Sequence, residues 1–314
     1  MIYDLIIIGG GPAGSAAAIY ASRKRLNTLL ITPIFGGQSV VSETIYNWIG
    51  SVSIGGQELA ENLKKHVIAN SKSDNNKDST LEIKEGSKVQ NITKNKNTFI
   101  IKTDTGEEFE TKTILMTAGS NRRKLEAKNA DKLEQKGLTY CATCDGPMFS
   151  GANVAVIGGG NAGFESAAQL LSYCNSVTLI NKTDTFRADA ITVEKLLKNT
   201  KFKVLKNIEI LEIKGEKFVE GLLYKDCVTN KENELKVTGI FVEIGQIPNT
   251  DFMKNLVAQD IVGKIKIDPW TGKTETPGIW AAGDCTNILY HQNNIAVGDA
   301  VRALEDIYLT LHSK

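Results

Sequence analysis

Residues 5–14 read LIIIGGGPAG, an apolar run followed by glycines that include Gly9, Gly11 and Gly14. The apolar run predicts a buried strand, and the alanine-rich residues after it predict a helix. In this context the first glycine makes a tight turn, the second lets the backbone approach a pyrophosphate, and the third lets helix and strand pack closely. The helix N-terminus would face the pyrophosphate with open N–H groups. The stretch therefore predicts a strand–turn–helix unit that binds a dinucleotide.

The same pattern recurs at residues 154–163, which read VAVIGGGNAG. The next apolar strand ends at Thr32, 23 residues after Gly9, and at Asn181, 23 residues after Gly158. One glycine-rich turn is weak evidence of a nucleotide site, but two copies with matched spacing are specific. We therefore predict an α/β protein with two Rossmann-like three-layer nucleotide-binding domains.

Composition limits the classes of protein to which the chain can belong. Its 314 residues are 41% hydrophobic and 23% charged, which is typical of a globular protein of two domains. The net charge of +1 argues against a nucleic-acid partner. We find no signal peptide and no apolar stretch long enough to cross a membrane. We therefore expect a cytoplasmic protein without a membrane partner.

Among five cysteines, only Cys141 and Cys144 are closely spaced, and Asp145 follows them directly. A zinc site would need two further ligands at suitable spacing, and the sequence offers none, so we predict no metal. A purely structural disulfide is rare in the cytoplasm. A short loop between two cysteines does suit redox chemistry, because one thiolate can attack while the other resolves. Asp145 suits a general acid, and it also suits a turn.

The domain order follows from a late strand that ends at Gly283 and Asp284. This strand end fits the first domain better than the second, so we expect the second domain to be inserted into the first. We place the first domain at residues 1–120 and 246–314, and the second at residues 121–245.

Several segments have less specific patterns. Residues 113–117 predict a strand, and residues 202–205, 221–224 and 239–242 resemble antiparallel strands. The polar residues 71–79 predict a mobile surface loop.

Together these motifs resemble the low-molecular-weight thioredoxin reductases, which are FAD-dependent pyridine nucleotide-disulfide oxidoreductases. The most specific match is CATCD at residues 141–145, just before the second glycine turn. Further matches are GGQ at 36–38, PN at 248–249 and AAGD at 281–284. The resemblance implies a thioredoxin-disulfide reductase in which electrons pass from NADPH to FAD, to the Cys141–Cys144 disulfide, and on to a thioredoxin or thioredoxin-like protein. It also implies a homodimer.

The resemblance implies distinct roles for the residues around the dithiol. Cys144 would lie near the flavin and receive electrons first, Cys141 would attack the disulfide of the partner, and Asp145 would protonate the departing thiolate. The inserted domain would rotate between two poses about hinges near Gly119 and Gly245.

The resemblance also implies two sets of nucleotide contacts. The FAD contacts would be Gly9, Gly11, Pro12, Ala13, Gly14, Gly37, Gln38, Asn47, Gly119, Gly283, Asp284, His291 and Gln292, with Asp284 on the ribityl chain. The nicotinamide nucleotide contacts would be Gly158, Gly160, Asn161, Ala162, Gly163, Asn181, Lys182 and Arg187.

The chain departs from the family after the second glycine turn. NADPH-using members carry His-Arg-Arg there, whereas this chain has Asn181, Lys182 and Thr183, with Arg187 further on. A 2′-phosphate favours fork-shaped guanidinium donors over the point charge of lysine. We expect NADPH, because Lys182 and Arg187 can both face a phosphate, and NADH stays open as the alternative.

Other functions remain compatible with these residues. The donor could be ferredoxin, and the acceptor could be a glutaredoxin-like or peroxidase-linked protein. A non-enzymatic redox sensor fits less well, because the dithiol is accompanied by Asp145.

Overall fold

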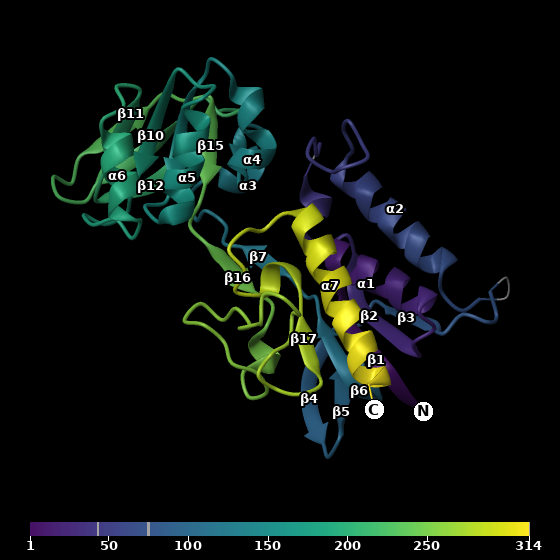
Figure 1. Ribbon diagram of the computed structural model, residues 1–314. Helices are drawn as coiled ribbons and strands as arrows, with labels where there is room; N and C mark the ends of the chain where they lie inside the picture. The colour runs from purple at the N-terminus through teal and green to yellow at the C-terminus, as the bar shows by residue number, and fades with distance from the viewer. Residues whose placement is uncertain (43, 74–75, 314) are drawn as a thin grey trace. The chain divides into compact units, whose positions relative to one another are not determined.

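The computed structural model describes residues 1–42, 44–73 and 76–313. The chain divides into two compact units, one formed by Met1–Asn121 with Ile247–Lys314 and the other by Arg122–Gln246 (Figure 1). The second unit is therefore inserted into the sequence of the first. Each unit has its own main sheet and its own apolar cores.

The first unit is built on a seven-stranded sheet with the order β3-β2-β1-β6-β5-β4, and β17 also pairs with β6. The pairs among β1, β2, β3, β6 and β17 are parallel, whereas β4 and β5 form an antiparallel extension. The apolar run of β1 suits a central strand that is buried on both faces. The strands are β1 (Ile2–Gly10), β2 (Thr28–Phe35), β3 (Leu81–Glu85), β4 (Val89–Asn95), β5 (Thr98–Thr103), β6 (Glu108–Met116) and β17 (Ile279–Ala281).

This sheet differs from the sequence prediction in two strands. The strand expected at 113–117 begins earlier, because the first half of β6 pairs with β5, with Phe99 opposite Thr111. The sequence does not predict β3, which alternates charged and apolar residues at the sheet edge. In the predicted loop 71–79, Ser73 and Asn76 form an isolated bridge, and residues 74–75 lie outside the described residues.

Helices cover the face of the sheet that contains Leu5, Ile7 and Leu115. Helix α7 runs beside α1 (Figure 1), and their alanines are buried in the same core as these strand residues. Small side chains let the helices approach the sheet closely. The helices are α1 (Pro12–Arg23), α2 (Gly56–Ala69) and α7 (Asn293–His312), and the 3-10 turns are η1 (Gly37–Val41), η3 (Asp251–Met253) and η4 (Gly283–Cys285).

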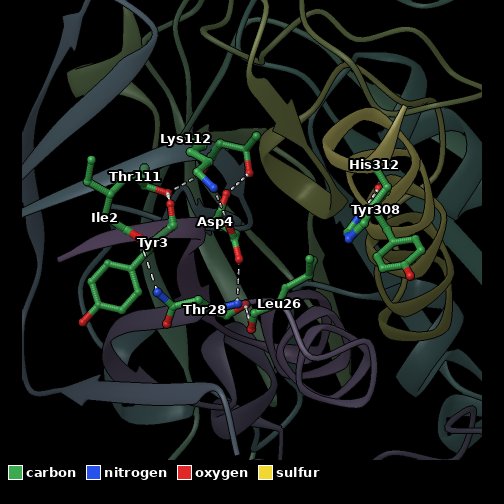
Figure 2. Close-up of polar contacts among 11 residues, drawn as sticks. Ile2, Tyr3, Asp4, Leu26, Thr28, Thr111, Lys112, Tyr308 and His312 are labelled. Carbon is green, nitrogen blue, oxygen red and sulfur yellow. Dashed lines mark hydrogen bonds and ion pairs between the residues drawn. The ribbon is translucent and has the colours of Figure 1, made fainter. Parts of the chain in front are cut away.

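Asp4 ties β1 to its neighbours at the amino-terminal end of the strand (Figure 2). Its carboxylate accepts a hydrogen bond from Nζ of Lys112 at 2.8 Å and another from the backbone N–H of Asn27 at 3.1 Å. Its carbonyl oxygen accepts from Oγ1 of Thr113 at 2.6 Å. These bonds help to hold β1 in register with β2 and β6. The glycine turn lies at the opposite end of β1.

The second unit contains a five-stranded parallel sheet with the order β11-β10-β9-β15-β8 and a three-stranded antiparallel sheet of β12, β13 and β14. The strands are β8 (Leu138–Thr139), β9 (Asn153–Ile157), β10 (Ser176–Ile180), β11 (Phe202–Leu205), β12 (Ile208–Lys214), β13 (Gly221–Asp226), β14 (Glu232–Leu235) and β15 (Gly239–Val242). The helices are α3 (Ala130–Leu133), α4 (Ala142–Asp145), α5 (Asn161–Leu170) and α6 (Ala190–Leu197), and η2 (Gly146–Phe149) follows α4.

Two strands that look antiparallel in the sequence are parallel. The segment 202–205 is β11, which runs parallel to β10, and 239–242 is β15, which runs parallel to β9 and β8. All four residues of β15 are buried, as expected of a strand within a parallel sheet. The expectation of an antiparallel strand is correct for 221–224, which lies in β13.

Two short strands form the connection between the units. They are β7 (Ser120–Arg122) and β16 (Gln246–Pro248), and they pair with each other. Within the described part of the chain, no helix is both long and apolar enough to cross a bilayer.

Candidate active site

Of the three motif glycines in the first turn, Gly9 and Gly14 are tightly packed and Gly11 is not. Gly9 has a φ of +110°, and a Cβ at this position would lie 2.5 Å from the carbonyl oxygen of Thr117. A Cβ on Gly14 would lie 2.8 Å from Oγ1 of Thr117 and closer still to the Gly9 carbonyl oxygen. At Gly11, in contrast, the nearest atom to a Cβ would be 3.9 Å away. The turn is therefore closed beneath Gly9 and Gly14 and open above Gly11.

A cavity of about 470 Å³ lies above this turn, within the first unit. No side chain caps the first turn of α1, so its N–H groups stay available to an anion. These features fit the pyrophosphate of a dinucleotide. Of the predicted FAD contacts, the cavity is lined by Gly9, Gly11, Pro12, Ala13, Gly37, Gln38, Gly119, Gly283 and Asp284.

The remaining predicted FAD contacts lie elsewhere. Gly14 is packed under the turn, and Asn47, His291 and Gln292 are not among the lining residues of the cavity. Nδ2 of Asn47 donates to Oε1 of Gln292 at 3.0 Å, so these two side chains join the loop before α2 to the start of α7.

A chain of side-chain amides that the sequence did not predict lies at the edge of the cavity. Nε2 of Gln38 donates to Oδ1 of Asn121 at 2.9 Å, and Nδ2 of Asn121 donates to Oδ1 of Asn249 at 2.9 Å. Nδ2 of Asn249 donates in turn to the carbonyl oxygen of Ala118 at 2.9 Å. The sequence marks Asn249 only as part of a motif, and no local pattern indicates that it meets Asn121.

His291 has an unexpected basic neighbour. Its Nε2 lies 3.2 Å from Nζ of Lys264. Burial lowers the pKa of Lys264, and burial together with the Lys264 charge lowers the pKa of His291, whereas the nearby Asp284 carboxylate opposes both effects. The lowered pKa of His291 favours its neutral imidazole beside Lys264.

The second glycine turn repeats the geometry of the first. Gly158 has a φ of +131°, and a Cβ there would lie 2.8 Å from the carbonyl carbon of Glu243. A Cβ on Gly163 would lie 2.9 Å from the carbonyl carbon of Gly158, whereas a Cβ on Gly160 would have no neighbour within 4 Å. The predicted contacts Asn161 and Ala162 are exposed at the start of α5, which has no side-chain cap. This turn also fits a pyrophosphate.

Asn181 is buried beside the second turn, and its side-chain amide forms hydrogen bonds within its own loop. Nδ2 donates to the carbonyl oxygens of Thr183 and Thr185, at 2.7 and 2.9 Å. Lys182 and Arg187 are exposed. The backbone N–H of Arg187 donates to the carbonyl oxygen of Gly159 at 2.8 Å, which anchors Arg187 beside the turn.

The dithiol lies at the start of the short helix α4. Cys141 and Cys144 form a disulfide, and both residues are partly exposed. Oγ1 of Thr139 donates to Oδ2 of Asp145. Burial raises the pKa of Asp145, while the Thr139 bond and the Arg122 charge act in the opposite direction. The net effect raises the pKa of Asp145 above that of an ordinary aspartate, so this carboxyl holds a proton more tightly, as suits a proton donor next to the disulfide.

Glu243 is a second carboxyl in this unit, and it is not among the site residues predicted from the sequence. It follows β15 directly, and its Oε1 accepts a hydrogen bond from Oγ of Ser166 at 2.6 Å. Burial raises the pKa of Glu243 to about 7. In the sequence, Glu243 could have been recognised as a charged residue directly after an apolar strand.

The other cysteines are not part of this site. Cys174 and Cys285 are buried, whereas Cys227 is exposed. In the described ranges, no group of three or more His, Cys, Asp or Glu side chains is placed to hold a metal ion.

Comparison with known proteins agrees with this geometry. The family model for pyridine nucleotide-disulphide oxidoreductases matches residues 3–301. The chain belongs to this family. Membership implies an oxidoreductase that uses a flavin and a pyridine nucleotide. The predicted family resemblance and fold class are thus confirmed.

Two solved structures are similar over nearly the whole chain. Thioredoxin reductase from Streptococcus pyogenes MGAS5005 has a TM-score of 0.89 at 30% identity, and the match covers 100% of this chain and 99% of that one. Thioredoxin reductase from Giardia duodenalis has a TM-score of 0.90 at 30% identity, with 98% and 99% covered.

Curated relatives are longer than this chain. NADH dehydrogenase of Bacillus subtilis is 34% identical over 301 residues, which are 96% of this chain and 57% of the relative. A subunit of alkyl hydroperoxide reductase from Escherichia coli is 36% identical over 302 residues, with the same shares covered. The chain thus spans a little more than half the length of these relatives.

Proposed function

We propose that the protein is a thioredoxin-disulfide reductase. Electrons pass from NADPH to FAD, then to the Cys141–Cys144 disulfide, and finally to a thioredoxin or thioredoxin-like protein. One observation carries the proposal: the disulfide and the partly buried Asp145 carboxyl lie together at one short helix, in a unit that also contains a dinucleotide turn. The full-length match to thioredoxin reductases supports the same substrate class.

The two units have separate tasks in this proposal. Residues 1–120 and 246–314 bind FAD, and residues 121–245 bind the nicotinamide nucleotide and carry the dithiol. The open space above Gly11 and the uncapped start of α1 support the first assignment. The same features at Gly160 and α5 support the second.

The protein's own residues direct thiols and protons. When bound, FAD would supply the two electrons that open the disulfide. Cys144 would receive them first, and the Cys141 thiolate would attack the disulfide of the protein substrate. Asp145 gives its proton to the substrate thiolate as that thiolate leaves, and Cys144 then resolves the mixed disulfide. Thr139 orients the Asp145 carboxyl for this transfer.

Movement between the two electron-transfer steps requires flexible connections. Gly119 and Gly245 have φ values of +62° and +99°, and a Cβ on either residue would have no neighbour within 4 Å. Both glycines lie next to the paired connecting strands β7 and β16. We assign the hinges to them, because their dihedral angles can change without a steric clash. A cytoplasmic homodimer completes the proposal, and sedimentation of the purified protein tests its oligomeric part.

A second candidate is a related reductase that takes electrons from NADH and serves a peroxidase-linked or glutaredoxin-like partner. The names of two curated relatives, an NADH dehydrogenase and an alkyl hydroperoxide reductase, favour it. So does Asn181, because this residue has no positive charge for a 2′-phosphate. Ferredoxin is a third donor to test.

Anaerobic reduction of the purified protein tests the donor. NADPH, NADH and reduced ferredoxin are added in turn, and flavin absorbance is followed. Turnover is then measured with thioredoxin, a glutaredoxin and a peroxidase-linked dithiol protein. Reduction by NADPH with thioredoxin turnover supports the leading proposal, whereas a protein that binds no FAD, or that never reduces thioredoxin, refutes it.

A further inference from the structure

The residue 23 positions after the first glycine of each turn faces inward, beneath that turn. In the first unit this residue is Thr32, which is 1% exposed, and its Oγ1 accepts a hydrogen bond from the backbone N–H of Gly10 at 2.9 Å. In the second unit it is Asn181, which is 7% exposed, and a Cβ on Gly159 would overlap its Oδ1 and lie 2.5 Å from its Cγ. Gly10 and Gly159 are the middle glycines of the two turns, so both copies use this position in the same way.

The side-chain amide of Asn181 is oriented by the loop that follows it. The amide lies 2.7 Å from the carbonyl oxygen of Thr183 and 2.9 Å from that of Thr185. Carbonyl oxygens only accept hydrogen bonds, so Nδ2 faces them and Oδ1 faces the turn. Dinucleotide folds that bind NAD place an acid near this position to accept from the ribose hydroxyl. Asn181 is instead occupied on both sides, by its own loop and by the glycine turn.

The loop between β10 and α6 is attached to the turn at two further points. The backbone N–H of Arg187 donates to the carbonyl oxygen of the middle glycine at 2.8 Å, and that of Asp189 donates to Oδ1 of Asn161 at 2.8 Å. The Phe186 ring packs edge-on against Phe164 of α5, with the ring centroids 5.0 Å apart. These contacts fix the backbone of Arg187 beside the start of α5, where the turn fits a pyrophosphate.

The acids of this loop are used within the protein, whereas its cations are exposed. A carboxylate oxygen of Asp184 lies 3.8 Å from Nζ of Lys206, and the Asp189 carboxylate accepts from two backbone N–H groups at the start of α6. Lys182 and Arg187 are both exposed. The folded loop therefore presents positive charge beside the second turn.

We propose that Asn181 is a positioning residue for nucleotide recognition, which holds the loop in the conformation that presents Lys182 and Arg187 to the 2′-phosphate of NADPH. The proposal rests on the proposed function, in which the second unit binds the nicotinamide nucleotide. The Asn181 side chain is bonded to its loop, so it acts on the nucleotide through that loop and not as a ligand of the ribose. The preference for NADPH then depends on the conformation of the loop.

Asn181→Asp separates this role from a direct ribose contact, because the two roles predict opposite results. Aspartate has the same shape, but it places a carboxylate oxygen where Nδ2 now donates to two carbonyl oxygens at 2.7 and 2.9 Å. Repulsion between these oxygens should displace the loop and weaken nucleotide binding. A residue that contacted the ribose hydroxyl would instead bind NAD+ more tightly as a carboxylate.

Binding of two adenosine nucleotides measures the effect without flavin or turnover. Adenosine 2′,5′-bisphosphate carries the 2′-phosphate, and adenosine 5′-phosphate lacks it. In Asn181→Asp we expect calorimetry to show an affinity for the bisphosphate that is about tenfold lower, which corresponds to about 1.4 kcal/mol. The affinity for adenosine 5′-phosphate should fall less than about threefold, which a general loss of folding would not produce.

Two variants control for the added negative charge. Asn181→Ala removes the same hydrogen bonds without a charge, and it should also weaken binding of the bisphosphate selectively. Asn199→Asp adds the same charge in the same unit, at an exposed residue whose Oδ1 only accepts from the N–H of Lys201, and it should bind both nucleotides as wild type does. Hydrogen exchange of the Arg187 N–H should be faster in both Asn181 variants and unchanged in Asn199→Asp.

Three results would overturn the proposal. They are tighter binding of NAD+ or adenosine 5′-phosphate by Asn181→Asp, unchanged affinity for the bisphosphate in Asn181→Ala, and unchanged exchange of the Arg187 N–H. A wild-type protein that binds the bisphosphate no better than adenosine 5′-phosphate also overturns it, and favours the NADH-dependent candidate. If the binding results are as expected but the protein never reduces thioredoxin, the proposed function fails while the role of Asn181 stands.

Discussion

The two glycine turns allow a matched test that separates nucleotide binding from folding. We compare Gly11→Ala with Gly14→Ala in the first turn. A Cβ on Gly11 would have its nearest neighbour at 3.9 Å, and the φ of this residue is −71°, which alanine readily adopts. A Cβ on Gly14 would meet Oγ1 of Thr117 at 2.8 Å and overlap the Gly9 backbone.

The expected stabilities follow from these contacts. In Gly11→Ala, the smaller entropy of the unfolded chain stabilises by about 0.4–1 kcal/mol, which offsets a loss of similar size at the N-cap. The free energy of unfolding should therefore change by less than about 1 kcal/mol. In Gly14→Ala, the backbone of the turn must move, and we expect a loss of about 3 kcal/mol or more.

The expected loss of FAD affinity, in contrast, is large for Gly11→Ala. The Gly11 methyl group would occupy the path of the pyrophosphate and displace it from the N–H groups of α1. Two charge-assisted bonds at about 1.5–3 kcal/mol each correspond to a loss of affinity on the order of a hundredfold or more. Gly11→Ala should thus fold normally and lack flavin.

Urea unfolding of the flavin-free proteins and fluorescence titration with FAD measure the two quantities. Gly160→Ala and Gly163→Ala form the equivalent pair in the second turn, where Gly160→Ala should keep FAD and lose reduction by the nicotinamide nucleotide. Normal FAD affinity in Gly11→Ala, or normal stability of flavin-free Gly14→Ala, would refute the reasoning.

Further predictions concern the dithiol, the donor and the buried acid. Replacement of Cys141 or Cys144 by serine should abolish disulfide reduction yet permit flavin reduction by the nicotinamide nucleotide. Stopped-flow absorbance measures flavin reduction and a thioredoxin assay measures disulfide reduction; thioredoxin turnover retained in either variant would contradict the assigned roles. Lys182→Ala should raise the KM for NADPH more than that for NADH, and Arg187→Ala should do the same; equal losses with both nucleotides would show that neither residue contacts the 2′-phosphate. Because the folded pKa of Glu243 is raised from 4.5 to about 7, the native state binds the proton more tightly than the unfolded state, and stability is lost as pH rises between these values. At pH 8, Glu243→Gln should therefore be more stable than wild type, by up to about 3 kcal/mol if solvent screening is neglected. At pH 4 the two proteins should be equally stable. Urea unfolding at both pH values measures the difference.

Local sequence rules were sufficient for the glycine turns and the dithiol. Gly9 and Gly158 must adopt positive φ, and Gly14 and Gly163 must pack against backbone, so each turn can form only with glycine at these positions. The Cys141–Cys144 spacing likewise allows a disulfide within one helical turn. The contacts of Gly14 with Gly9 and of Gly163 with Gly158, like the cysteine spacing, involve neighbours within a few residues, which is why the sequence alone predicted them.

The direction of the strands could not be predicted as well from the sequence. An apolar four-residue strand such as 239–242 has the same pattern whether its partners run parallel or antiparallel. Only the pairing of β15 with β9 and β8 made it parallel, and that pairing depends on segments remote in the sequence.

The electrostatic surroundings of the site were decided entirely by the tertiary structure. The sequence singled out Asp145 and His291, but it could not indicate that the Arg122 charge acts on the Asp145 carboxyl or that Lys264 lies 3.2 Å from His291. Glu243 is nearly a hundred residues from Asp145 and reaches the same sheet edge only because β8 pairs with β15. A pKa depends on burial and on charges in space, and neither is a property of neighbouring residues in the chain.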